Sequence, residues 1–238
     1  MFLEDIPSFG RRLHMDTEEL QRSEREAWQL IHAKTKRGSA YRRRNHEQFA
    51  TFFPEGHRTS LREIVTYAAE VLEGGLNFVG TRAYLLDQVH PRALRLIEKH
   101  GKDYWPLTWR GTEIHTDTVQ PQPRSCAADA IHLARLFNRT TPGRTHITYV
   151  EGITFGPDVP IMLHAWNARG WGGKCRDWSH YSVSHWSRYI GIPFTLTEWE
   201  ELRMLIAPQE NACPLLFADT HFPLIEGRVV EILEKRKG

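Results

Sequence analysis

Three runs rich in β-branched and aromatic residues follow one another between Thr145 and Trp178, and turn signals separate them. The first signal is the Gly-Pro-Asp stretch at 156–158, and the second is the glycine-rich stretch at 169–173. Short strands joined by such turns pair with their neighbours in sequence, so this region is predicted to fold as an antiparallel meander. This prediction excludes an all-helical chain.

Just before the meander, small and apolar residues recur at helical spacing, and Cys126 lies at or beside the first turn of the predicted helix. Unpaired backbone N–H groups and the positive end of the helix dipole stabilise an anion there. The thiolate form of Cys126 is therefore favoured. Its own backbone N–H is placed to donate to the oxyanion of a tetrahedral intermediate.

The second hairpin of the meander predicts a partner for a histidine. If the chain reverses at 170–171, Trp166 faces Cys175 and His164 faces Asp177. Directly opposed residues point to the same face with Cβ atoms roughly 4.5–5.5 Å apart, which suits an imidazole that donates to a carboxylate. A slip of one residue would send one partner to the other face, so the prediction depends on the turn.

These residues occur in a recognisable order: a cysteine opening a helix, Tyr-Val-Glu-Gly at 149–152, His-Ala-Trp at 164–166, then an aspartate. The order resembles the transglutaminase-like branch of the papain-like cysteine enzymes, over about Ser125 to Trp178. The resemblance implies a triad with Cys126 as nucleophile, His164 as general base and acid, and Asp177 as the group that orients the histidine. The family usually continues its aspartate with Pro-Thr, whereas Trp-Ser follows here.

Five further residues are candidate supports of this site. Reversal of the first hairpin places Glu151 opposite His164 from the other side, so Glu151 is a second candidate for the third member. Gln120 or Gln122 precedes the cysteine, where papain-like enzymes often carry an amide that stabilises the oxyanion. Trp166 and Trp178 flank the histidine and the aspartate and are predicted to line the substrate cleft.

The rest of the chain is expected to be mainly helical at its N-terminal end. Ser60 and Glu63 form a capping box before an apolar stripe, and Pro91 to His100 reads as a helix with proline first and glycine after it. We therefore expect the α+β class: a helical region at 1–110 and a papain-like core at 111–238, with the cysteine helix on an antiparallel sheet.

Charge and composition limit the partners. With 31 basic and 29 acidic residues the net charge is only +2, so a nucleic acid or an anionic membrane is not the expected partner. The basic run from Lys34 to Arg44 is a candidate surface for an acidic protein, although neighbouring glutamates favour a solvated helix end. No run of about 20 apolar residues and no signal peptide is evident. With only three cysteines, these features predict a cytoplasmic protein.

Neither a metal nor a cofactor is predicted. No glycine-rich phosphate loop is present, and the closely spaced Cys175, His180 and His185 lack a convincing fourth ligand for zinc.

The residues together predict a cysteine-dependent acyl-transfer enzyme that acts on an amide bond of a protein or peptide. A peptidase- or amidase-type hydrolase is favoured because water is always available, and a protein deamidase or transglutaminase shares the same chemistry. The alternatives are a cell-wall peptidoglycan amidase and an inactive papain-like binding module.

Overall fold

The computed structural model describes residues 17–54, 57–73, 89, 91–106, 126–140, 146–169, 173–177, 187–206, 213–215 and 222–237. The helices are α2 (Thr17–His32), α3 (Lys36–Phe52), α4 (Leu61–Glu73), α6 (Pro91–His100), α7 (Cys126–Thr140), α8 (Leu196–Leu205) and α9 (Phe222–Lys235). The strands are β1 (Lys102–Pro106), β2 (Ile147–Gly156), β3 (Val159–Arg169), β4 (Gly173–Arg176) and β5 (Arg188–Phe194). Both element types occur in quantity, which confirms the α+β class.

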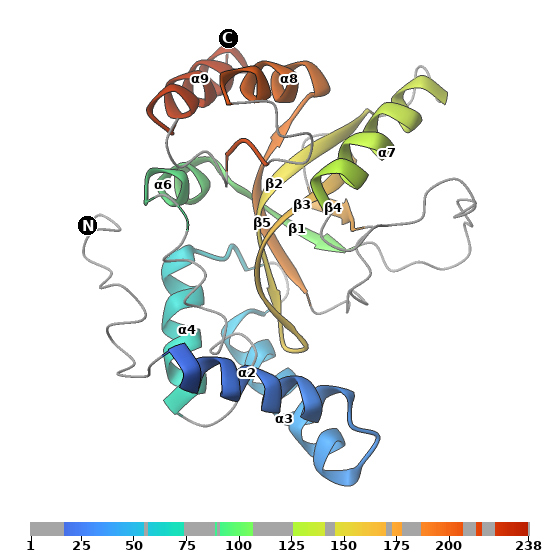
Figure 1. Ribbon diagram of the computed structural model, residues 1–238, viewed down its shortest axis with the longest axis vertical. Helices are drawn as coiled ribbons and strands as arrows, with labels where there is room; N and C mark the ends of the chain where they lie inside the picture. Colours follow the sequence, from blue (N-terminus) through green and yellow to red (C-terminus); the bar gives the residue numbers. More distant parts are fainter. Residues whose placement is uncertain are drawn as a thin grey trace.

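The five strands close into a barrel in the order β1-β4-β3-β2-β5, with β1 pairing to β5 (Figure 1). The β2–β3 and β3–β4 pairs are antiparallel, as the meander predicted, but β1 runs parallel to β4. A closed barrel of this kind is not the antiparallel sheet of a papain-like core, so that part of the expectation was wrong. Because β1 precedes residue 110, the region predicted to be mainly helical also supplies one strand of the barrel.

Two apolar clusters lie on the two sides of the barrel wall. The inner one takes residues from all five strands and therefore fills the barrel: Tyr104, Val150, Trp166, Ala168, Cys175 and Tyr189. The outer one is larger and joins the opposite faces of β2, β3 and β5 to α3, α4, α6, α7, α8 and α9. Alternation of side chains along each strand separates the two sets.

Local signals place the helices that cover this wall. Ser60 Oγ accepts from the Glu63 N–H at 3.2 Å, and the Glu63 carboxylate accepts from the Ser60 N–H at 2.7 Å, which is the predicted capping box of α4. Helix α6 spans Pro91–His100, as the proline and glycine signals indicated.

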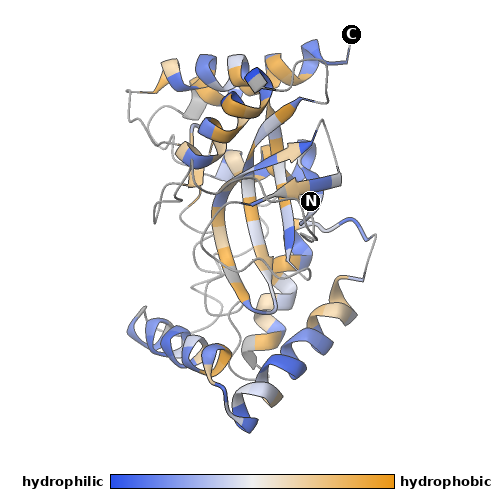
Figure 2. Ribbon diagram, turned by 90° about the vertical axis from the view of Figure 1, so that its right-hand side faces the viewer, coloured by the Kyte–Doolittle hydropathy of each residue, from blue (hydrophilic) through white to orange (hydrophobic). Residues whose placement is uncertain are grey.

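Helices α2 and α3 form an arm at one end of the molecule, next to the β2–β3 turn (Figure 1). This end is largely hydrophilic in Figure 2, and its small apolar cluster of Ala27, Ile31 and Tyr41 is separate from the other two. His46 Nε2 contacts Asp158 Oδ2 at 2.6 Å and so joins α3 to the turn between β2 and β3. In the described part of the chain, no helix has both the length and the apolar character required to cross a bilayer.

Candidate active site

Helix α7 begins at Cys126, the position that its sequence predicted. The helix is fastened to the barrel wall by side-chain amides, because the Asn167 amide donates to the Ala130 carbonyl at 2.8 Å and Asn138 bonds both backbone groups of Ile147. Cys126 is partly exposed, whereas the small residues after it are buried against β2 and β3. The first backbone N–H groups of the helix therefore point toward the cysteine end of the site.

His164 on β3 and Asp177 after β4 meet as predicted, although by a different register. The strands pair Ala168 with Cys175 and Asn167 with Arg176, so the pairing is shifted by two residues and Cys175 does not face Trp166. A shift of two keeps every side chain on its face. His164 Nε2 lies 2.8 Å from Asp177 Oδ2, and both side chains are buried.

Tyr189 on β5 is a third member of this group. Its hydroxyl donates to Asp177 Oδ2 at 2.9 Å, the same oxygen that His164 contacts. Burial first, and then the charge of Asp177, raise the pKa of Tyr189 well above its ordinary value, so the hydroxyl keeps its proton. Asp177 is thus held as an acceptor between an imidazole and a phenol.

The interaction between Cys126 and His164 favours the charged form of each side chain. The pKa of Cys126 is lowered to about 4, first by a hydrogen bond from the Cys213 thiol. Burial opposes this shift, whereas a hydrogen bond to His164 and the charge of His164 add to it. Burial alone would lower the pKa of His164, but the Asp177 charge and hydrogen bonds to Asp177 and Cys126 outweigh it and raise the value to about 10. Because Nε2 is at Asp177, Nδ1 is the ring nitrogen left for an interaction with Cys126.

The edge of β3 explains how a helix outside the barrel reaches a histidine that faces into it. β3 pairs with β4 at Asn167 and Ala168, and none of the described strands lies beside the preceding residues of β3 on that edge. The Ala165 N–H donates to the Cys126 sulfur there. Cys126 therefore sits at the strand edge, within reach of His164 on the inner face.

Glu151 does not lie beside His164, as its prediction as a third member required. Gly152, not Glu151, pairs with His164, so the Glu151 side chain lies on the outer face of the wall. There its carboxylate accepts from the Tyr149 hydroxyl and from the Leu215 N–H, both at 2.9 Å. The prediction was wrong by one residue, because the register shift between Thr154 and Gly156 offsets the pairing.

Trp166 is buried inside the barrel and does not line a cleft, so that expectation was also wrong. Its ring packs against Tyr104 and Tyr189 and stacks on His164 with centroids 6.1 Å apart. Trp166 lies two residues after His164 on β3, so both side chains point to the inner face of the barrel. Its contact with the imidazole makes it a support for the histidine ring.

Several predictions concern residues outside the described ranges. These are Gln120, Gln122, Trp178, His180 and His185. Cys175 is described and lies buried in the barrel, where burial raises its pKa well above the ordinary value. Across the described ranges, no three His, Cys, Asp or Glu side chains are grouped as metal ligands would be.

The sequence analysis missed Cys213 and Tyr189. Cys213 is far from Cys126 in the chain, and a lone cysteine in a short apolar stretch carries no local signal of its partner. Tyr189 belongs to the run Arg-Tyr-Ile-Gly-Ile-Pro-Phe at 188–194, whose β-rich character indicates a strand but not its place beside Asp177.

The basic run is partly used within the arm. The Arg42 guanidinium donates to the carbonyl oxygens of Ile31 at 2.5 Å and Ala33 at 3.1 Å, which satisfies the end of α2. Arg44 lies over the Tyr41 ring at 5.5 Å. The four other basic side chains of the run are exposed, namely Lys34, Lys36, Arg37 and Arg43. Binding of an acidic partner there stays a prediction.

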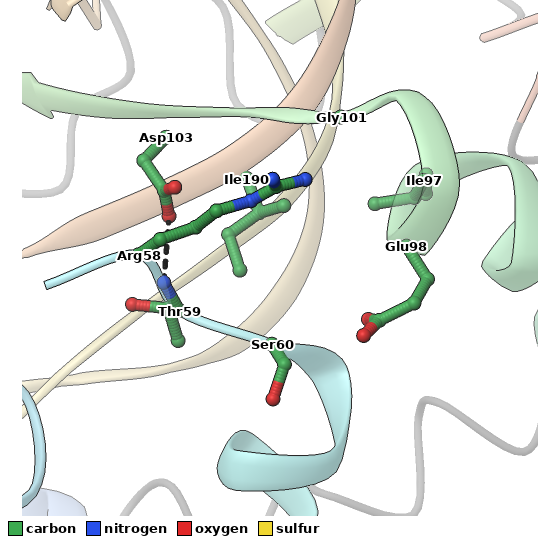
Figure 3. Close-up of a pocket in the computed structure, with 8 residues that line it drawn as sticks. All are labelled: Arg58, Thr59, Ser60, Ile97, Glu98, Gly101, Asp103 and Ile190. Atoms are coloured by element: carbon green, nitrogen blue, oxygen red, sulfur yellow. Dashed lines mark hydrogen bonds between the residues drawn. The ribbon is translucent and has the colours of Figure 1, made fainter.

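A separate cavity of about 130 Å³ lies where α4, α6, β1 and β5 meet (Figure 3). Its carboxylates already accept from backbone groups, since Asp103 bonds the Thr59 N–H at 3.2 Å and Glu98 bonds the Leu61 N–H at 2.7 Å. The lining includes none of the triad residues, so this cavity is not the site of the predicted chemistry.

Comparisons with protein-family models, with curated proteins and with solved structures found no match to this chain. The case for a function therefore depends on the geometry of the site itself.

Proposed function

We propose that the chain is a cysteine-dependent acyl-transfer enzyme that acts on an amide bond of a protein or peptide. The observation that carries the proposal is one continuous set of contacts from Cys126 through His164 to Asp177. A nucleophilic thiol needs a thiolate, a proton-transfer group and a residue that orients that group, and the three side chains meet these needs. The reaction class also follows the resemblance to transglutaminase-like enzymes, although the barrel differs from their expected sheet.

The first chemical step is attack by the Cys126 thiolate on the carbonyl carbon of the amide. Negative charge then develops on the carbonyl oxygen. The Cys126 backbone N–H, which has no acceptor within the helix at its first position, is a suitable donor to that oxygen. The tetrahedral intermediate is thereby stabilised at the N-terminus of α7.

In the second step the His164 imidazolium gives its proton to the leaving nitrogen, the carbon–nitrogen bond breaks and a thioester remains on Cys126. Neutral His164 then takes a proton from water, which attacks the thioester and restores the thiolate and imidazolium. An amine in place of water gives transfer. We favour hydrolysis of a peptide or isopeptide-type amide, because water requires no second binding site.

The test is the rate of iodoacetamide alkylation at each cysteine as a function of pH, read by mass spectrometry on the folded chain. Cys126 is expected to react fastest and to keep that advantage at pH 6, well below the ordinary thiol pKa of about 8.5. Asp177→Asn is expected to lower the pKa of His164 by about 1–3 units and so shift the Cys126 profile to higher pH. Asp158→Asn, which removes the carboxylate beside His46, should leave the profile unchanged.

A Cys126 that alkylates like an ordinary thiol, or whose profile is the same in Asp177→Asn, would contradict the proposal and favour an inactive binding module. Amide hydrolysis on a peptide library provides the direct measurement. Cys126→Ala and His164→Ala should each abolish it while circular dichroism shows the same fold, and activity in Cys126→Ala would rule the mechanism out.

A further inference from the structure

Cys213 lies against the candidate nucleophile although the proposed reaction does not use it. It begins a short described segment, 213–215, that is attached to β2 at two points. The Leu215 N–H donates to Glu151 at 2.9 Å, and the Tyr149 hydroxyl contacts the Cys213 sulfur at 3.7 Å. Cys213 is only 2% exposed. Its position is therefore fixed by buried polar contacts.

Cys126 packs against the same outer apolar cluster to which Cys213 belongs, and the side-chain interaction between the two thiols favours the thiolate on Cys126 and the protonated thiol on Cys213. That interaction, burial and the neighbouring Glu151 charge raise the pKa of Cys213 well above its ordinary value. The pair therefore combines one nucleophilic thiolate, which is partly exposed, with one protonated thiol, which is buried. This is the arrangement of an attacking and a resolving cysteine.

We propose that Cys126 and Cys213 form a reversible disulfide when a hydroperoxide oxidises Cys126, and that this bond switches off the site. The regulatory part of this inference rests on the proposed function, since it takes Cys126 as the nucleophile. The disulfide itself depends only on the contact between the two cysteines.

The reaction balances in two steps. The Cys126 thiolate attacks one oxygen of hydrogen peroxide, the O–O bond breaks, a sulfenic acid forms and the other oxygen leaves as water after protonation by His164. Cys213 then attacks the Cys126 sulfur, the S–O bond breaks and the Cys213 proton leaves with that oxygen as a second water. Two thiols lose two electrons in total, and the peroxide gains them.

The disulfide protects the nucleophile as well as blocking it. A sulfenic acid without a nearby thiol is oxidised further to sulfinic and sulfonic acids, which thiol reductants do not reverse. Cys175 offers no such route, because it lies in the inner cluster of the barrel, on the other side of the wall from Cys213. Of the three free cysteines, Cys213 is therefore the partner that the structure offers to Cys126.

The test treats the full chain with hydrogen peroxide and maps cysteine states by differential alkylation and mass spectrometry. The wild-type chain is expected to yield a Cys126–Cys213 peptide pair that dithiothreitol separates, with full recovery of Cys126 alkylation. Cys175→Ser should behave identically. Cys213→Ser and Cys213→Ala should lose the pair and accumulate Cys126 with two or three added oxygens, which dithiothreitol does not remove.

The inference is overturned if wild-type Cys126 reaches the over-oxidised forms as fast as Cys213→Ser does, or if it pairs with Cys175. The first result compares the wild-type chain with Cys213→Ser, whereas the second is read on the wild-type chain alone and so needs no folded variant. The pH profile of alkylation separates this inference from the proposed function. A reactive low-pKa Cys126 without a disulfide overturns only the switch, whereas a disulfide in a chain without amide activity overturns only the function.

Discussion

At the scale of single residues, Asp177 is the group on which the ionisation of the site depends. It is buried and charged, a costly combination unless partners compensate, and both His164 and Tyr189 bond to one of its oxygens. Asp177 holds the proton on His164, and the imidazolium, together with the Cys213 thiol, favours the thiolate of Cys126. A change at Asp177 is therefore expected to reach the sulfur without any contact between the two.

The opposite pKa shifts of Cys126 and His164 give the stability of the chain a particular dependence on pH. The pKa of Cys126 falls from 9.0 to about 4 on folding, so its contribution is present at high pH and is lost as the pH falls through about 4. The pKa of His164 rises from 6.5 to about 10, so its contribution is present at low pH and is lost as the pH rises through about 10. Between pH 6.5 and 9, folding releases one proton from Cys126 and takes up one proton on His164. The two residues together therefore leave the free energy of unfolding independent of pH in this range.

Cys126→Ser removes the titration of the thiol, and it also removes a contact that helps to raise the pKa of His164. The thiol part is therefore read below pH 6.5, where the difference in unfolding free energy, wild type minus variant, is expected to rise from pH 4 with a slope of at most about 1.4 kcal/mol per pH unit. Urea unfolding at a series of pH values measures it. A difference that stays flat across this window would show that Cys126 is a neutral thiol in the folded chain.

At the scale of elements, the site was predictable where its parts are close in sequence. The capping box of α4, the bounds of α6, the start of α7 and the His164–Asp177 pair all follow from signals within about a dozen residues. The predicted His164–Asp177 contact was correct although the predicted register of β3 and β4 was not. The error was two residues, and such a shift leaves each side chain on the same face of the sheet. The Glu151 prediction failed because its error was one residue, and such an error reverses the face.

Other parts of the site were not predictable because they depend on contacts between distant segments. Closure of the barrel by β1, and with it the burial of Trp166, depends on a parallel pairing with β4. Likewise, Cys213 reaches Cys126 only through the folded positions of Tyr149 and Glu151. One sequence carries no record of such pairings.

Gly152 is the element-scale feature that sets the space around His164. It pairs with His164 on β3 and with Gly191 on β5, and a Cβ at Gly152 would collide with the Ile190 carbonyl oxygen. Gly152→Ala is therefore expected to destabilise the chain by about 3 kcal/mol, since the obstacle is backbone. It should also slow Cys126 alkylation at pH 6, because β2 and β5 must separate beside the histidine.

Gly227→Ala is the matched control. Gly227 lies in α9, and nothing lies within 4 Å of an added Cβ, so alanine should stabilise that helix by about 0.5–1 kcal/mol. Thermal unfolding of both variants, together with alkylation at pH 6, provides the comparison. Equal melting temperatures for the two would mean that β2 and β5 are not packed as closely as the described backbone indicates.

At the scale of the whole molecule, the chain is one large core with an arm attached. The outer cluster joins residues on both sides of position 110, so the helices that precede the barrel and those that follow it stabilise the same wall. Phe49 of α3 belongs to this cluster, whereas Ile31 of α2 belongs to the separate cluster of the arm. Cooperative unfolding should therefore include α3 but not α2.

Two large-to-small substitutions test this division. Phe49 is buried among Phe53, Tyr67 and Phe155, with ring centroids 5.0 to 5.9 Å away, so Phe49→Ala should cost about 3–5 kcal/mol of global stability. Ile31→Ala removes a contact only of the arm, and its cost is expected to appear as faster hydrogen exchange in 17–32 with little change in the melting temperature. Peptide-resolved hydrogen exchange and thermal unfolding distinguish the two variants. If Ile31→Ala lowered the melting temperature as much as Phe49→Ala, the arm would be part of the cooperative core, and the basic run beside it would be a structural element of that core.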